Sequence, residues 1–197
     1  MRFVLASGNA GKVVELEQLF AGSGVELVAQ TSLGVSDADE TGLTFVENAL
    51  IKARHAARIT GLPALADDSG ICVDALDGAP GLYAARYAGT HGDSAANNAK
   101  LLRELDGVPS DKRTAYFIAV LVVLRHADDP APLIAEGRWY GRILEAPRGE
   151  GGFGYDPLFL PDGYDVSAAE LDVALKNRLS HRGQALDVLK ARFAELA

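Results

Sequence analysis

The start of the sequence constrains the fold most, because an apolar stretch leads through a glycine turn straight into a helical pattern. Residues 2–7 form a short apolar run typical of a buried strand. Apolar residues then recur at helical spacing over 11–22, which predicts a helix with Glu15 on the face turned away from the core. "GSG" ends this pattern, and "VELVAQ" at 25–30 alternates like a second strand. The order predicts a βαβ opening, with the glycine turn at the carboxyl end of the first strand.

A second helix has a clear start signal and a polar face. A capping box at Thr44 and a glycine stop predict a helix over 44–61. Asn48, Lys52 and His55 share one face of that helix at four- and three-residue spacing. An acidic loop precedes the helix.

The rest of the chain mixes strand and helix patterns. "PALADDSGICVDALDGAPG" (63–81) predicts two short extended segments that are broken at 67–70. The remaining expected elements are a helix over 93–105, a strand over 114–127, an antiparallel partner over 132–143, a glycine-rich loop with a short strand over 149–161, and two helices from 167 onward with a polar break around 177–183. Together these elements predict an α/β fold, a mixed twisted sheet flanked by helices.

Composition limits the class of protein. The 197 residues are 48% hydrophobic and contain no clear linker, so we expect a single domain over 1–197. No apolar run reaches the roughly 18 to 20 residues of a membrane span. The N-terminal stretch is far shorter than a signal peptide, and the single cysteine fits a reducing compartment. We therefore expect a cytoplasmic protein that does not insert into a membrane.

Charge narrows the choice of partner. Nineteen basic residues against twenty-seven acidic ones give a net charge of −8, and no run of Lys or Arg stands out. A nucleic-acid groove is therefore not expected. A polyanionic small molecule could still bind, provided that local cations or a metal ion offset the field of the protein.

The stretch "SGNAGK" (7–12) raises the question of phosphate binding. It fails the Walker A pattern twice, because Ala6 stands at the first glycine position and Val13 at the last. What remains is a strand, a glycine turn, a helix N-terminus and Lys12, which together favour an anion. Taken alone, the stretch fits a phosphate loop and an ordinary strand–helix turn equally well.

Two adjacent acids in "ADDSG" form the second candidate site. If the strand continues, Asp67 and Asp68 point to opposite sides, so only one of them faces a given site. Such a carboxylate could hold Mg²⁺ and orient or deprotonate a water molecule. A turn is the competing interpretation, and the pattern alone favours it slightly.

Three further segments each allow two interpretations. The acids Asp37, Asp39 and Glu40 could bind metal, although a charge-rich loop is usually solvated surface. "GGFGYDP" (151–157) could offer an aromatic ring to a base or could be a turn with core aromatics. The cationic segment "KNRLSHRG" (176–183) could meet an anionic ligand or could simply be surface.

The order of these segments is more specific than any one of them. "SGNAGK", "DETGLTFVENALIKARHAA", "ALADDSGICVDALDGAPGLYAARYAG", "GGFGYDPLF" and "SHRGQAL" follow one another as they do in the Ham1/RdgB family, which the chain closely resembles over essentially its whole length. The family comprises inosine/xanthosine triphosphate pyrophosphatases. The resemblance implies Mg²⁺-dependent hydrolysis of ITP, dITP and XTP to the monophosphate and pyrophosphate, by a homodimer with two lobes and an active site in the cleft between them.

The resemblance also implies roles for individual residues. Asp68 would be the general base and a metal ligand, with Glu40 and the adjacent Asp39 as further metal contacts. The substrate-binding residues implied in this way are Ser7, Gly8, Asn9, Ala10, Gly11 and Lys12 for the triphosphate, Ser69, then Phe153, Gly154, Tyr155 and Asp156 around the base, and Lys176, His181 and Arg182 for purine and phosphate contacts.

One position departs from the family pattern, and two other functions stay open. Leu175 stands where the family often has Glu, so any role of that acid is in doubt here. One alternative is a pyrophosphatase with another base preference, similar to the Maf-type enzymes. The other is a protein that binds nucleotides without hydrolysing them, for which a general base at Asp68 would serve no purpose.

Overall fold

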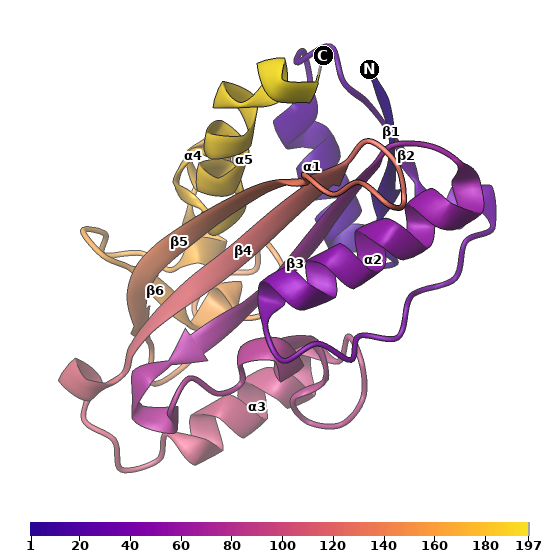
Figure 1. Cartoon of the computed structure of the whole chain (residues 1–197). Helices are drawn as coiled ribbons and strands as arrows, with labels where there is room; N and C mark the ends of the chain where they lie inside the picture. The colour runs from indigo at the N-terminus through magenta and orange to yellow at the C-terminus, as the bar shows by residue number, and fades with distance from the viewer. Residues whose placement is uncertain (197) are drawn as a thin grey trace. The chain divides into compact units, whose positions relative to one another are not determined.

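The computed structural model describes residues 1–196 and is built on one mixed β-sheet (Figure 1). Its strand order is β2-β1-β3-β4-β5-β6. The strands are β1 Arg2–Ala6, β2 Glu26–Ala29, β3 Ala64–Val73, β4 Thr114–Leu124, β5 Leu133–Ile143 and β6 Phe159–Pro161. The α-helices are α1 Ala10–Phe20, α2 Phe45–Thr60, α3 Ser94–Glu104, α4 Val173–Leu179 and α5 His181–Ala191. Short 3-10 helices cover Gln30–Leu33, Asp74–Leu76, Gly81–Arg86, Ser110–Lys112, Asp156–Leu158, Ala168–Glu170 and Phe193–Leu196.

The predicted βαβ opening is confirmed. Strand β1 pairs in parallel with β2 and with β3, while β5 and β6 are antiparallel, so the sheet is mixed as expected. Asn9 caps α1 by accepting a hydrogen bond from the Lys12 N–H. Thr44 caps α2 in the same way through the N–H of Glu47, and Gly61 ends that helix with φ of 69°.

The prediction for residues 63–81 was wrong in one respect. Strand β3 runs unbroken through 67–70 instead of turning there. Carboxylates are poor strand residues when they lack partners. Here both Asp67 and Asp68 are buried against cations, which removes the reason for a turn.

The chain folds into two compact units, each assembled from separated segments. Unit 1 comprises Met1–Asp68, Ala119–Gly137 and Arg182–Ala197, and unit 2 comprises Ser69–Ile118 and Arg138–His181. Strands β3, β4 and β5 therefore contribute residues to both units.

The core of unit 1 lies between its helices and its strands. Buried residues of α1 and α5, such as Leu16 and Leu186, pack on one face of the strands with Leu5 and Leu121. Helix α2 packs against β1 and lies on the opposite face of these strands from α1 and α5 (Figure 1). Its buried positions are mostly alanines, which lets the helix approach the sheet closely.

The core of unit 2 is aromatic. Phe117 packs against Trp139, Phe159 and His181, with ring centroids 6.3, 4.7 and 4.8 Å apart. Leu101 of α3 is fully buried in the same core. Such offset and edge contacts add to the free energy gained from burying the rings.

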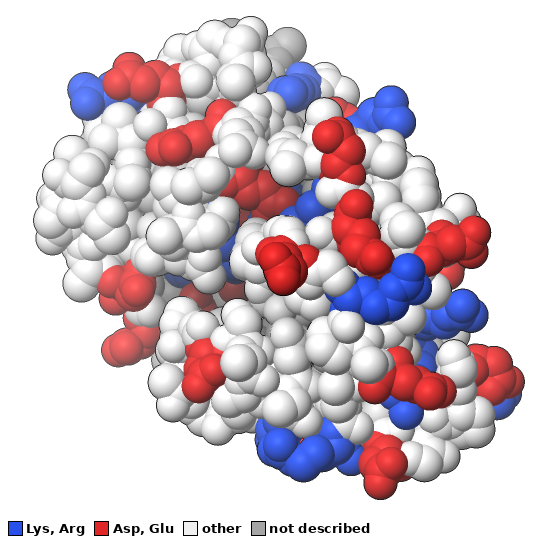
Figure 2. Space-filling model, turned by 180° about the vertical axis from the view of Figure 1, so that it is seen from behind, with Lys and Arg blue, Asp and Glu red and all other residues white. Residues whose placement is uncertain are grey.

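Two further observations concern the distribution of charge and the character of the helices. Acidic and basic side chains are interspersed over the face shown in Figure 2. Within residues 1–196, no helix combines the length and the apolar character needed to cross a membrane.

The aromatic core supports a stability prediction. Leu101→Ala should lower the free energy of unfolding by about 2–5 kcal/mol, because it leaves a cavity in a fully buried site. Urea denaturation followed by the fluorescence of Trp139, the only tryptophan, measures this in the same core. Ile59→Ala on the exposed side of α2 is the control and should change the free energy by no more than about 0.5 kcal/mol. Equal effects of the two substitutions would contradict the assignment of this core.

Candidate active site

The glycine loop (residues 7–12) links β1 to α1 and presents backbone N–H groups at the start of the helix. Ser7 is buried, and its hydroxyl oxygen accepts a hydrogen bond from the N–H of Asn9 at 3.2 Å. The Asn9 side chain in turn accepts from the N–H of Lys12 at 3.1 Å. The loop is therefore held by its own short polar side chains, and the positive end of the α1 dipole lies at its edge.

Gly8 in this loop has no room for a side chain. A Cβ atom there would lie 2.6 Å from both carboxylate oxygens of Asp37. The Asp37 carboxylate is held in place by Gln30, whose Nε2 donates to Oδ1 at 2.6 Å. Glycine is thus required because the acidic loop approaches the glycine loop closely.

A buried ionic cluster lies behind the glycine loop; we call it the Arg182 cluster, and it consists of Lys12, Glu15, Asp67 and Arg182. Arg182 donates from Nε to Asp67 Oδ2 at 3.2 Å and from Nη1 to Glu15 Oε2 at 2.6 Å. The Lys12 ammonium lies 3.1 Å from the same oxygen of Asp67. Asp67 is fully buried and Arg182 is only 3% exposed. Two cations and two carboxylates leave the cluster formally neutral.

Burial and the neighbouring charges shift the pKa values of Asp67 and Lys12. Burial alone would raise the pKa of Asp67, but Arg182 and Lys12 outweigh it and hold that pKa well below its usual range. Burial lowers the pKa of Lys12, and the Asp67 carboxylate opposes this.

The prediction that Glu15 faces away from the core was wrong. Glu15 is 6% exposed and its carboxylate points to the guanidinium of Arg182. The helical period identifies the apolar face of α1 correctly, but it carries no information about a cation 167 residues away in sequence.

A second group of charges gathers around Lys52; we call it the Lys52 cluster, and it consists of Glu40, Lys52 and Asp68. The Lys52 ammonium donates to Asp68 Oδ1 at 2.6 Å and to the backbone oxygen of Asp67 at 2.8 Å. It also lies 3.2 Å from Glu40 Oε1. Burial opposes the charge on Lys52, but Asp68 and Glu40 prevail and raise its pKa. Burial raises the pKa of Asp68 even though Lys52 pulls it the other way.

The polar face of α2 holds the acidic loop in place. Asn48 accepts a hydrogen bond from the N–H of Gly42, and a ring nitrogen of His55 lies 2.9 Å from the backbone oxygen of Ser36. Together with Lys52 these are the three residues that the helical spacing placed on one face. This face thus fixes the loop that carries Glu40.

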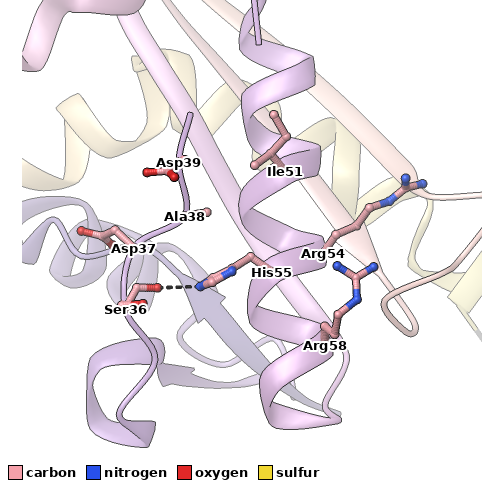
Figure 3. Close-up of a pocket in the computed structure, with 8 residues that line it drawn as sticks. All are labelled: Ser36, Asp37, Ala38, Asp39, Ile51, Arg54, His55 and Arg58. Atoms are coloured by element: carbon pink, nitrogen blue, oxygen red, sulfur yellow. Dashed lines mark hydrogen bonds between the residues drawn. The ribbon is translucent and has the colours of Figure 1, made fainter. Parts of the chain in front are cut away.

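Asp39 is not among the residues described as contacting the Lys52 ammonium. It lines a cavity of about 590 Å³ (Figure 3). The figure shows α2 on one side of this cavity and the acidic loop on the other. Its lining residues are Ser36, Asp37, Ala38, Asp39, Ile51, Arg54, His55 and Arg58.

In unit 2, the segment 151–157 is organised around a buried carboxylate. Asp156 accepts hydrogen bonds from the N–H of Phe153 and from the ammonium of Lys176, each at 2.8 Å. The same ammonium lies 5.3 Å from the centre of the half-buried Phe153 ring. Gly154 has φ of 63°, a conformation that favours glycine, and its backbone oxygen accepts from Asn98.

The side chains of Tyr155 and His181 are largely buried within unit 2. The Tyr155 hydroxyl donates to the backbone oxygen of Ala84 at 2.7 Å, and the ring of His181 stacks on Phe117. Both residues are about 5% exposed. Ser69 is half-buried on β3, directly after Asp68.

The predicted site residues therefore divide between the two units. Unit 1 holds residues 7–12, Asp39, Glu40, Asp68 and Arg182, whereas unit 2 holds Ser69, residues 153–156, Lys176 and His181.

Sequence reasoning did not assign Lys52, Asp67 or Glu15 to the site. Lys52 could have been found, since it shares a helix face with Asn48 and His55. Asp67 was visible as one of two adjacent acids, but only its contacts with Lys12 and Arg182 reveal its position in a cluster.

Comparison with known proteins shows which family the chain resembles. Residues 3–192 match the model of the Ham1 family. A protein of Xanthomonas oryzae pv. oryzae named "dITP/XTP pyrophosphatase" is 63% identical over 194 residues, covering 98% of each chain. Another of that name from Xanthomonas axonopodis pv. citri is 65% identical over 189 residues, covering 96% of this chain and 95% of the relative.

A solved structure agrees as well. The structure of a Ham1 protein from Coxiella burnetii superimposes with a TM-score of 0.90 at 47% identity, covering 99% of both chains. A family match over almost the whole length and relatives above 60% identity leave one conclusion: the chain belongs to the Ham1 family.

Proposed function

We propose that this chain hydrolyses the deaminated purine nucleoside triphosphates ITP, dITP and XTP to the monophosphate and pyrophosphate, with Mg²⁺. The observation that carries the proposal is that unit 1 combines a glycine loop at the N-terminus of α1 with the carboxylates of the Lys52 cluster. The names of the relatives from two Xanthomonas species support the substrate class. A cytoplasmic homodimer is part of the same proposal, which rests on the family resemblance.

The glycine loop is proposed to hold the triphosphate. A triphosphate carries about four negative charges at neutral pH, so an acidic chain must offset them locally. Lys12 and the N–H groups at the start of α1 supply positive charge there. Ser7 and Asn9 each accept a hydrogen bond from a backbone N–H of the loop, and this keeps the loop in place.

Asp68 is proposed as the general base. It would accept a proton from the water molecule that attacks the α-phosphorus, while pyrophosphate leaves. A raised pKa makes a carboxylate a stronger base, and burial raises the pKa of Asp68. Lys52 would orient the carboxylate through its 2.6 Å contact with Oδ1.

Glu40 and Asp68 are the residues that we assign to Mg²⁺. Both carboxylates already converge on one cation, the ammonium of Lys52, and carboxylate oxygens suit Mg²⁺. Among residues 1–196, no group of three or more His, Cys, Asp and Glu could hold a metal ion. This fits an ion that is held by one or two carboxylates plus substrate phosphates. Bound Mg²⁺ supplies Lewis-acid stabilisation of phosphate charge.

The base is proposed to be recognised by residues of unit 2. The Phe153 ring offers a stacking surface, and Lys176 and His181 supply donors for a 6-oxo purine. Adenine would leave such donors unpaired, which costs binding free energy.

The substrate assignment is tested by pyrophosphate release from ITP, XTP, dITP, ATP, GTP and the pyrimidine triphosphates, each with and without Mg²⁺. The kcat/KM for ITP and XTP should exceed that for ATP and GTP by roughly 100-fold or more, because unpaired polar groups penalise the wrong base. Equal values would contradict the assignment. A preference for modified pyrimidines would favour a Maf-like activity, and tight binding without turnover would favour a nucleotide-binding protein.

Asp68→Asn should lower kcat for ITP by about 10²- to 10⁴-fold, because the amide cannot accept the proton. Binding of ITP, measured by calorimetry, should be largely retained. Asp77→Asn is the matched control, since Asp77 is exposed shortly after β3 and should leave kcat unchanged. An active Asp68→Asn enzyme would remove Asp68 from the mechanism.

Glu40→Gln should raise the Mg²⁺ concentration needed for half-maximal activity at least about tenfold, because it removes one of two carboxylates at the assigned site. Asp39→Asn is the comparison, because Asp39 lines the cavity of Figure 3 and has no contact with Lys52 among those described. A larger shift for Asp39→Asn than for Glu40→Gln would assign the metal contact to Asp39 instead.

A further inference from the structure

Glu15 is a buried carboxylate that the proposed reaction does not use. It lies on α1, one turn after Lys12, with 6% of its surface exposed. A buried carboxylate is costly unless it is paired, so its position needs a reason. Its carboxylate oxygen Oε2 accepts a hydrogen bond from Nη1 of Arg182 at 2.6 Å.

Arg182 connects Glu15 to the proposed phosphate site. The guanidinium donates to Glu15 and to Asp67 from two different nitrogens, and Asp67 shares its Oδ2 atom with the Lys12 ammonium. A planar guanidinium that is held at two points has little freedom to rotate. The chain of contacts therefore runs from Glu15 through Arg182 and Asp67 to Lys12.

We infer that Glu15 is a positioning residue for nucleotide binding, which rests on the function proposed above. Glu15 fixes the orientation of Arg182 and, through Arg182 and Asp67, the position of the Lys12 ammonium beside the glycine loop. Without the Glu15 charge, the two cations would share a single carboxylate within the cluster. Both of the groups proposed to meet the anionic substrate would then lose their fixed geometry.

The test is the steady-state kinetics of ITP hydrolysis by Glu15→Gln, which keeps the shape of the side chain and removes its charge. The KM for ITP should rise about tenfold or more, because positioned charge contacts with the phosphates are weakened. A merely structural role would lower the amount of folded enzyme, and hence the apparent kcat, and leave KM unchanged. Glu17→Gln, on the exposed side of the same helix, is the matched control and should keep the wild-type KM.

A double-mutant cycle tests whether Glu15 affects nucleotide binding through Arg182 or independently of it. In an Arg182→Gln background, Glu15→Gln should change kcat/KM less than about twofold, because residues in one network are not additive. The double variant removes one negative and one positive charge, so the cluster stays formally neutral. We therefore expect the double variant to fold even if Glu15→Gln alone does not. Equal effects of Glu15→Gln in both backgrounds would overturn the inference.

A third variant tests the reach of the side chain. Glu15→Asp keeps the charge but is one methylene shorter, and it should give a KM between the wild-type and Glu15→Gln values.

A wild-type KM for a folded Glu15→Gln enzyme would overturn the inference even if wild-type enzyme hydrolyses ITP. Failure of the wild-type enzyme to hydrolyse any triphosphate would instead contradict the proposed function.

Discussion

The guanidinium of Arg182 is the contact on which the arrangement of unit 1 depends. It binds Asp67 on β3 and Glu15 on α1, at sequence separations of 115 and 167 residues. All three side chains are less than 10% exposed. Removing one partner of a buried ion pair typically costs about 3–5 kcal/mol, because the remaining charge is left without compensation. The start of α5, the first helix and the middle of the sheet are therefore held together by charge as well as by the apolar core.

The two ionic clusters lie on opposite faces of strand β3. Asp67 and Asp68 are neighbours on β3, and alternation along a strand turns their side chains in opposite directions. Asp67 joins Lys12 and Arg182, whereas Asp68 joins Lys52. The Arg182 cluster is formally neutral, and the Lys52 cluster has one more carboxylate than cations. The surplus negative charge thus lies where a divalent cation is proposed to bind, and the neutral cluster supports the loop proposed for phosphate.

Much of the fold could be predicted from local patterns. The β1–α1–β2 opening, the cap at Thr44, the polar face of α2 and the mixed sheet follow from periodicity and capping, which are properties of short segments. Residues 67–70 and Glu15 could not be placed in this way. In both cases the local signal for a turn or an exposed position is outweighed by cations from remote parts of the chain. Local rules fail here because buried charges depend on partners that the fold brings together.

The sequence by itself determined the family resemblance, the α/β class and most of the candidate site residues, because the five motifs lie in a fixed order along the chain. Only the tertiary structure decided which charges meet. Lys52 between Glu40 and Asp68, and Arg182 between Glu15 and Asp67, are contacts across long sequence separations. The energy of an ion pair depends on distance in space and on burial, and neither can be obtained from the spacing of residues along the chain.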